Sequence, residues 1–150
     1  MEKGDKFPDL LGVDASGKEV RLSDYPGKKF IIYFYPKDNT PGCSAEACSL
    51  RDGMESFAAD GYQIIGVSKD SEASHQKFAA KYDLKFPLVA DTSTELCQLA
   101  GVWQKKKMAG RVYMGIVRTT FVTDENGVVT EVIRKVNTKD AAGQLKELLK

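Results

Sequence analysis

The chain has 150 residues, of which 42% are hydrophobic and 29% are charged, and these values exclude a disordered, fibrous or membrane-embedded protein. Its 22 basic and 21 acidic residues give a net charge of +1, so the overall field favours neither a nucleic acid nor an acidic membrane as a partner. A chain of this length is expected to form one domain, residues 1–150.

Features of exported or membrane proteins are missing from the sequence. Its longest apolar run, residues 31–35, is far below the roughly 18 residues that a membrane span needs. Residues 1–6 contain no hydrophobic stretch of the kind found in a signal peptide. We therefore expect an intracellular, cytoplasmic protein.

The first elements in chain order are a hairpin and a strong strand. Short apolar runs on both sides of a turn at residues 14–17 predict strands at residues 10–13 and 19–22. Residues 29–35 contain the continuous β-prone run FIIYFY, which is typical of a central strand buried on both faces.

After a loop at residues 36–42, an amphipathic helix is expected at residues 43–59. Its apolar residues recur at offsets of three and four, and they are Ala47, Leu50, Met54 and Phe57. The next predicted elements are a strand at 62–68, a helix at 71–82 and a strand at 86–90. A capping box at 92–95 is expected to start a short helix that ends at Ala100. The last predicted elements are strands at 119–123 and 128–135 and a helix at 138–149 that buries Leu145, Leu148 and Leu149.

The order of these elements predicts an α/β protein. Alternating strands and helices before residue 100 indicate parallel βαβ units, and the turn at residues 124–127 indicates an antiparallel hairpin. The expected architecture is a central mixed β-sheet flanked by helices, with an N-terminal β-hairpin, which is the thioredoxin-like fold. Ligands of open α/β sheets bind beyond the carboxyl ends of the strands, where the loop at residues 36–42 is expected.

Three cysteines, Cys43, Cys48 and Cys97, point to thiol chemistry. An odd number cannot all pair within the chain, and a domain of this size does not need disulfides to fold. A structural zinc site would require close pairs such as Cys-x-x-Cys, whereas the closest pair here has four residues between its members and His75 is the single histidine. We therefore expect neither a metal nor a bound cofactor.

Four features outside the loop receive structural interpretations. The run Lys105-Lys106-Lys107, beside glycine and small residues, is interpreted as a solvated loop. His75 falls on the polar side of its predicted helix and is expected at the surface. Cys97 lies in an apolar stretch and is interpreted as a partly buried structural thiol. Trp103 is expected to pack at the edge of the core, in a stretch at residues 101–115 that could border the active site.

Cys43 is expected in the first turn of its helix. There the unpaired amide N–H groups and the positive end of the helix dipole stabilise a thiolate. Thr40, three residues earlier, offers a hydroxyl that could hydrogen-bond a sulfur anion or a substrate oxygen. The alternative is a buried structural cysteine at the start of the apolar stripe, and the placement of Cys43 alone leaves both interpretations open.

A known active-site signature favours the first interpretation. Residues 36–43, PKDNTPGC, resemble the Pro-x-x-x-Thr-x-x-Cys signature of the peroxiredoxins over its full spacing. The segment TPGCSAEAC at residues 40–48 resembles the peroxiredoxin Q group, also called bacterioferritin comigratory proteins, in which a second cysteine follows five positions later. The likeness extends from Pro8 to the terminal helix.

The resemblance implies a role for each member of the signature. Cys43 is then the peroxidatic cysteine, Thr40 orients the peroxide and Pro36 shields the sulfur from water. The family's arginine matches Arg118, which would lie near Cys43 if its strand runs antiparallel beside residues 29–35, and the alternative for Arg118 is an ordinary surface arginine. Glu46 is expected either to orient Arg118 or simply to favour the first helical turn.

Cys48 is implied to be the resolving cysteine that forms a disulfide with Cys43. Five helical residues advance about 7.5 Å and turn about 140° past a full circle, so the two sulfurs face apart in an intact helix. A disulfide needs Cα atoms within roughly 7 Å, so its formation must unwind the first helical turns. The alternative for Cys48, which points away from the apolar stripe toward Asp52 and Glu55, is a surface cysteine without a function.

The sequence therefore predicts a cofactor-free, thiol-dependent peroxidase that reduces hydrogen peroxide and organic hydroperoxides. Thioredoxin or a similar dithiol is expected as the reductant, and a monomer is expected because proteins of the peroxiredoxin Q kind are often monomeric. One rival is a disulfide oxidoreductase of the same fold, although that chemistry usually relies on a Cys-x-x-Cys motif. The other is a non-enzymatic, chaperone-like module.

Overall fold

The computed structural model describes all residues from Met1 to Lys150. Its strands are β1 (Leu10–Val13), β2 (Glu19–Arg21), β3 (Lys29–Phe34), β4 (Tyr62–Ser68), β5 (Leu88–Ala90), β6 (Trp103–Met108), β7 (Arg111–Ile116), β8 (Thr119–Thr123) and β9 (Val129–Ile133). Its helices are α1 (Pro41–Ala59), α2 (Glu72–Tyr82), α3 (Glu95–Leu99) and α4 (Ala141–Leu148), with 3₁₀ turns η1 (Leu22–Asp24) and η2 (Thr138–Asp140).

A five-stranded mixed sheet in the order β5-β4-β3-β8-β9 forms the centre of the molecule. Strand β3 is parallel to β4, as the sequence predicts, and antiparallel to β8, which is the condition under which Arg118 was expected near Cys43. The β3 side chains from Phe30 to Phe34 are all buried, because both faces of the sheet are covered. The pairing of Phe34 with Thr119 brings the end of β3 level with the start of β8.

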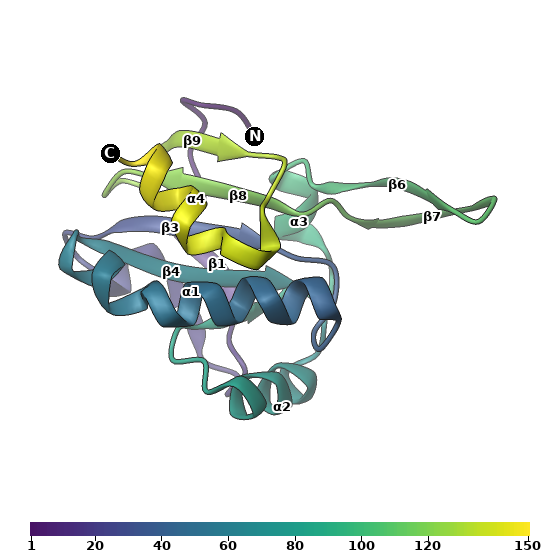
Figure 1. The fold of residues 1–150 in the computed structure, drawn as a ribbon. Coiled ribbons are helices and arrows are strands. Elements are labelled where there is room, and N and C mark those ends of the chain that lie inside the picture. The colour runs from purple at the N-terminus through teal and green to yellow at the C-terminus, as the bar shows by residue number, and fades with distance from the viewer.

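Two hydrophobic clusters cover the two faces of this sheet. On one face Ile31 and Tyr33 pack with residues of α1, α2 and α4. On the other face Phe30 and Ile32 pack with the β1–β2 hairpin and with α3. Figure 1 shows α1 and α4 in front of the sheet and α3 and β1 behind it. The alternation of inward side chains along β3 therefore fixes the layered architecture.

Residues 101–116 form a β-hairpin, so the prediction of a solvated loop for Lys105-Lys106-Lys107 was wrong. All three lysines belong to β6, which pairs with β7 from Trp103 to Met108. Figure 1 shows that the hairpin projects away from the rest of the molecule. Backbone pairing with β7 forms this strand with little burial, since Met108 and Val112 are 65% and 62% exposed. Trp103 packs against the core as expected.

The prediction of a surface histidine was also wrong, because His75 is completely buried. It lies in α2 but faces the loop after β3. Hydrogen bonds to both ring nitrogens satisfy this polar side chain inside the protein, which the helical pattern of apolar residues cannot reveal.

Two helix ends differ from the expected ones. The capping box at residues 92–95 does not form, since the N-cap Thr94 has no side-chain cap bond. The carboxylate of Asp91 instead accepts the N–H groups of Leu96 and Cys97 at the start of α3. In α4 Leu145 is buried, whereas Leu148 is 41% exposed and does not join the core.

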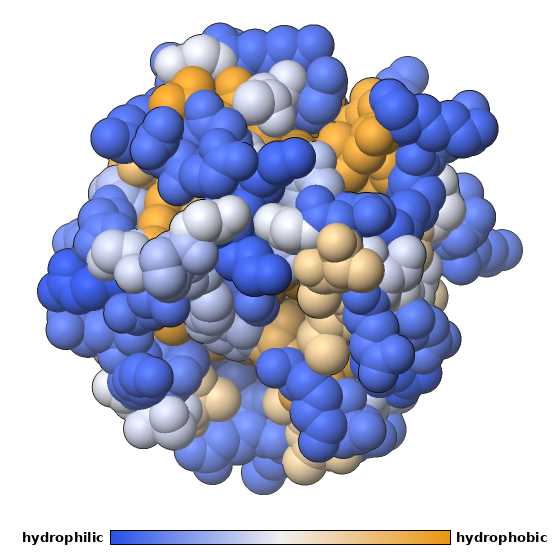
Figure 2. All heavy atoms as spheres, turned by 90° about the vertical axis from the view of Figure 1, so that its left-hand side faces the viewer, coloured by the Kyte–Doolittle hydropathy of each residue, from blue (hydrophilic) through white to orange (hydrophobic).

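The surface is mainly hydrophilic on the side of the molecule opposite the β6–β7 hairpin. Figure 2 shows this side, where hydrophobic side chains appear only as small patches between polar ones. None of the helices combines the length and the apolar character that crossing a membrane would require.

Candidate active site

Cys43 lies in the first turn of α1, at the carboxyl end of the sheet. Thr40 is the N-cap residue, and Pro41 begins the helix with a φ angle that suits its first position. Cys43 is 1% exposed and packs in the cluster that contains Tyr35 and Ala47. The helix start thus holds a thiol where unpaired amide groups and the helix dipole favour its anion.

Arg118 lies directly beside this thiol. It precedes β8, so the antiparallel pairing with β3 brings it to the start of α1, as the sequence predicts. Its Nη2 donates to the Cys43 Sγ at 3.3 Å, and its Nη1 donates to Glu46 Oε1 at 2.6 Å. A Cβ atom at Gly42 would lie only 3.2 Å from Arg118 Nη2, so the glycine leaves room for the guanidinium.

Glu46 is a fully buried carboxyl group one turn after the helix start. Burial raises its pKa to about 7, although the positive charge and hydrogen bond of Arg118 act in the opposite direction. Burial would lower the pKa of Arg118, but the interactions with Glu46 and Cys43 outweigh this effect and raise the pKa of the guanidinium. Arg118 therefore carries a permanent positive charge between the carboxyl group and the sulfur.

The other two members of the signature, Thr40 and Pro36, lie in the loop before α1, and neither forms a hydrogen bond with the Cys43 sulfur. The hydroxyl of Thr40 donates to the carbonyl oxygen of Lys37 at 3.0 Å, which leaves its oxygen free to accept. Pro36 is half-buried in the same loop.

Lys106 is a neighbour of the site within the stretch at residues 101–115, which the sequence analysis expected could border the active site, although this lysine was not singled out. It is half-buried on β6, and its Nζ donates to the carbonyl oxygen of Ile116 at 2.7 Å. Burial and the charge of Arg118 lower the pKa of Lys106, whereas Cys43 raises it. The pairing register of the β6–β7 hairpin determines that Lys106 is half-buried while Lys105 and Lys107 are exposed, and the sequence alone does not predict this register.

Cys48 lies on a different side of α1 from the core. It is half-buried, whereas its neighbour Ala47 is fully buried. Together with Asp52, Lys139 and other residues it lines a surface cavity of about 560 Å³ between α1 and the η2 turn. All three cysteines are free thiols in this structure.

Cys97 is remote from these groups and more deeply buried than expected. Burial and the neighbouring carboxylate of Asp91 raise the pKa of its thiol. It therefore remains a neutral, structural thiol within the core.

A second polar cluster, missed by the sequence interpretation, lies below the loop that follows β3. Ligand-type atoms of Asp38, Asp70 and His75 all lie within 4.8 Å of one another. Asp38 belongs to the signature segment, but it occupies one of the positions that the signature leaves unspecified. Only the tertiary structure brings α2 and its histidine to this aspartate.

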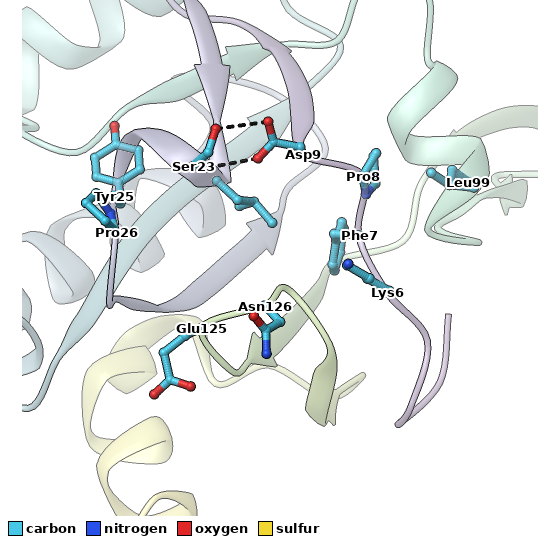
Figure 3. Close-up of a pocket in the computed structure, with 11 residues that line it drawn as sticks. Lys6, Phe7, Pro8, Asp9, Ser23, Tyr25, Pro26, Leu99, Glu125 and Asn126 are labelled. Carbon is cyan, nitrogen blue, oxygen red and sulfur yellow. Dashed lines mark hydrogen bonds between the residues drawn. The ribbon is translucent and has the colours of Figure 1, made fainter.

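A large surface cavity lies away from the cysteines and from the polar cluster. It has a volume of about 710 Å³ and is lined by residues of the N-terminal segment and of the η1 and β8–β9 turns. Figure 3 shows that Lys6, Asp9 and Ser23 come to its edge and that Asp9 and Ser23 hydrogen-bond each other. None of the cysteines lines it.

Known proteins resemble this chain over nearly its whole length. The model of the AhpC/TSA family matches residues 3–132. Peroxiredoxin Bcp of Bacillus subtilis (strain 168) is 47% identical over 150 residues, which cover 100% of this chain and 96% of the relative. Peroxiredoxin Bcp of Escherichia coli (strain K12) is 36% identical over 140 residues, which cover 93% of this chain and 90% of the relative.

Solved structures give the same result. A cysteine mutant of PrxQ from Xylella fastidiosa superimposes with a TM-score of 0.86 at 33% identity, covering 100% of this chain and 98% of that one. A Xanthomonas campestris bacterioferritin comigratory protein, studied for its alkyl peroxide reduction activity, gives 0.80 at 37% identity, covering 91% and 85%. These similarities confirm the thioredoxin-like fold that the order of elements predicts.

Proposed function

The chain belongs to the AhpC/TSA family and is a thiol-dependent peroxidase of the peroxiredoxin Q group, and from this premise we propose that Cys43 is the residue that attacks the peroxide. The observation that supports this assignment is the donation of Arg118 Nη2 to the Cys43 Sγ at 3.3 Å. A guanidinium at this distance stabilises the thiolate and is placed to donate to a peroxide oxygen next to it.

In the proposed step the Cys43 thiolate attacks one oxygen of the hydroperoxide. An S–O bond forms as the O–O bond breaks, and the departing oxygen takes a proton and leaves as water or an alcohol. The sulfur is oxidised to a sulfenic acid while the peroxide is reduced. Negative charge develops on both oxygens, and preorganised donors such as Arg118 and the amide groups of α1 stabilise it.

We assign supporting roles to three further residues. Glu46 holds the guanidinium of Arg118 through the 2.6 Å hydrogen bond to its Oε1. Thr40 orients the peroxide with its hydroxyl, which would require that hydroxyl to turn from Lys37 toward the substrate. Pro36 shields the sulfur from water. These assignments follow the positions that match the peroxiredoxin signature.

The sulfenic acid is then resolved by Cys48. Its thiol attacks the oxidised sulfur, a disulfide forms and the sulfenic oxygen leaves as water. Both cysteines lie on one helix at five-residue spacing, so their Cα atoms are about 7.5 Å apart along its axis and their side chains diverge. Resolution therefore has to be accompanied by unwinding of the start of α1.

A dithiol such as thioredoxin is proposed to reduce the Cys43–Cys48 disulfide. One thiol of the dithiol attacks one sulfur, so that a mixed disulfide forms and the other cysteine is released as a thiol. The second thiol of the reductant then attacks the mixed disulfide, which releases the remaining cysteine and leaves the reductant as a disulfide. Three free cysteines and a reductive cycle suit the reducing cytoplasm. We further propose that residues 1–150 act as one domain and as a monomer.

Disulfide mapping tests the two cysteine assignments together. The reduced protein is treated with one equivalent of hydrogen peroxide, digested and analysed by mass spectrometry. We expect a Cys43–Cys48 disulfide in the wild type and a Cys43 sulfenic acid in Cys48→Ser. A bond from Cys43 to Cys97 would contradict the assignment of Cys48, and persistence of a Cys43 thiol would contradict the assignment of Cys43.

A further inference from the structure

The loop between β3 and α1 is joined to the rest of the protein by a buried polar cluster. Asp38, at 6% exposure, lies in the middle of this loop. Its carboxylate accepts the hydroxyl of Tyr35 at 2.6 Å and the hydroxyl of Ser74 at 2.8 Å, and it lies 2.7 Å from His75 Nδ1. Its backbone N–H donates to Asp70 Oδ2 at 2.9 Å.

Both ring nitrogens of His75 face acceptors. Nδ1 meets the Asp38 carboxylate, and Nε2 lies 3.0 Å from the carbonyl oxygen of Val89 in β5. A carbonyl oxygen can only accept, so Nε2 carries a hydrogen and donates it to Val89. The geometry is that of an imidazole held at both ring nitrogens by oxygen atoms, with no exposed surface on the histidine.

The surroundings of Asp38 favour its ionised form. Burial alone would raise the pKa of Asp38, but the hydrogen bonds from His75 and Tyr35 outweigh it and hold this pKa below its usual value. The other charged groups around the cluster are Asp70, which accepts the hydroxyl of Ser68 at 2.7 Å and the N–H of Asp38, and Lys77 and Lys81, which line the same cavity as Asp38. Both ring nitrogens of the histidine already face oxygen partners, so neither is open to a metal ion.

This cluster fixes the loop at a place where its backbone needs support. Asn39, immediately after Asp38, has a φ of +60°, in the left-handed region that few side chains adopt freely. Thr40 follows as the N-cap of α1, and Cys43 lies three residues later. A shift at Asp38 would therefore move the start of α1 and, with it, Cys43. The hydrogen bond from Arg118 to the Cys43 sulfur depends on this placement.

We propose that the buried, hydrogen-bonded His75–Asp38 pair is a positioning device that holds the loop at residues 36–40 in place, so that unwinding of α1 during disulfide formation stops short of the loop. The inference rests on the proposed reaction of Cys43 with peroxide. His75 and Asp38 do not touch the reacting atoms. They set the geometry to which Cys43 returns after each cycle.

The test compares Asp38→Asn, His75→Gln, the double variant and Leu145→Ala. Leu145 is buried in the core at α4 and serves as a control for general loss of stability. We expect each single cluster variant to slow peroxide oxidation of Cys43 about tenfold to a hundredfold, because small misplacements of reacting groups have effects of this size. The double variant should be no slower than the worse single variant, because the two residues act as one unit, and Leu145→Ala should oxidise at the wild-type rate.

Amide hydrogen exchange on the oxidised proteins distinguishes the proposed positioning role from a general effect on folding stability. In the oxidised wild type the amides of residues 42–48 should exchange rapidly while the Asp38 amide, which donates to Asp70, stays protected, and in His75→Gln the Asp38 amide should also exchange rapidly. Exchange of the Asp38 amide in the oxidised wild type tests by itself where the unwinding stops, so the proposal stays testable if a variant does not fold.

Several results would overturn the inference. They are additive effects of the two single variants, equal slowing in Leu145→Ala, rapid exchange of the Asp38 amide in the oxidised wild type, or unchanged exchange of this amide in His75→Gln. In each case normal oxidation of Cys43 in the wild type would leave the proposed function intact. If peroxide did not oxidise Cys43 in the wild type, the proposed function would fail first and the inference with it.

Discussion

Cys43 and Cys97 occupy the same position in two different helices. Each is the third residue after the N-cap, which is Thr40 in α1 and Thr94 in α3. Each is also almost completely buried, at 1% and 0% exposure. By helix position and burial alone the two thiols are equivalent, yet the groups that surround them differ in charge.

The two thiols differ in the charged side chain that lies next to the start of each helix. Cys43 faces the guanidinium of Arg118, whereas the start of α3 is capped by the carboxylate of Asp91, which lies 2.8 Å from the backbone nitrogen of Cys97. A cation beside a thiol stabilises its anion, and a carboxylate opposes it. A helix N-terminus is therefore insufficient to make a reactive cysteine, because a capping anion can occupy it first.

The largest effect is expected from removing the two thiols separately. Cys43→Ser should abolish peroxide turnover, because a serine hydroxyl remains protonated and is a poor nucleophile toward oxygen. Cys97→Ser should keep turnover within about twofold of the wild type, since surface and core variants away from the site change mainly stability. A peroxide consumption assay with a thiol reductant measures both, and substantial activity of folded Cys43→Ser would remove the basis of the comparison.

The next effect concerns the cation beside Cys43. Arg118→Ala should slow oxidation of Cys43 by peroxide about a hundredfold, the size expected for loss of one preorganised donor. Alkylation by a neutral reagent should slow less, because it needs the thiolate but no donor for a departing oxygen. Stopped-flow oxidation and alkylation rates on the same protein measure the two effects, and equal slowing would reduce Arg118 to a role in thiolate formation alone.

Residues that form regular elements or repeat a known signature were predictable from the sequence. The FIIYFY run of β3 and the apolar spacing of α1 follow from local patterns, and together they place Cys43 at the carboxyl edge of the sheet. Arg118 was predictable because it matches the arginine of the family that the chain resembles, and its place beside Cys43 follows from the antiparallel pairing of β3 with β8, in which Phe34 lies opposite Thr119.

The buried polar contacts could not be predicted in this way. His75 lies on the polar side of the α2 pattern, yet this side packs against the loop of Asp38 and becomes internal. Asp91 precedes α3 and caps it from outside the expected capping box. Both outcomes depend on tertiary contacts between segments, and the spacing of polar residues along the sequence does not indicate which segments come into contact.

The carboxyl group near Cys43 should give a pH-dependent stability. The pKa of Glu46 is raised by burial from 4.5 to about 7, so the folded protein binds this proton more tightly than the unfolded chain. Its contribution to stability is therefore full below about pH 4.5 and is lost as the pH rises through about 7, by an amount on the order of 3 kcal/mol for a shift of this size. Glu46→Gln should lack this loss, because its amide does not ionise.

Urea denaturation of the reduced wild type and Glu46→Gln at pH 5 and pH 8 measures the difference. The wild type should lose stability relative to the variant between these two values, and subtracting the two curves removes titrations that both proteins share. A wild-type stability that rose relative to Glu46→Gln over this range would show that the Arg118 ion pair outweighs burial.

The smallest effect is expected from the carboxylate near Cys97. Asp91→Asn removes the negative charge that contributes, after burial, to the raised pKa of this thiol, so that pKa should fall toward its ordinary range. Burial remains, and access of reagents to Cys97 still requires opening of the core. Alkylation of Cys97 should therefore accelerate only a few-fold, and loss of the negative charge at the start of α3 should cost about 0.5 kcal/mol of folding stability, because the asparagine oxygen can still accept a backbone N–H. Mass-spectrometric alkylation rates of Cys97, normalised to the unfolding equilibrium from denaturant titration, separate the two contributions. A Cys97 that became as reactive as Cys43 would show that the anion alone keeps it inert, whereas an unchanged normalised rate would assign its inertness to burial.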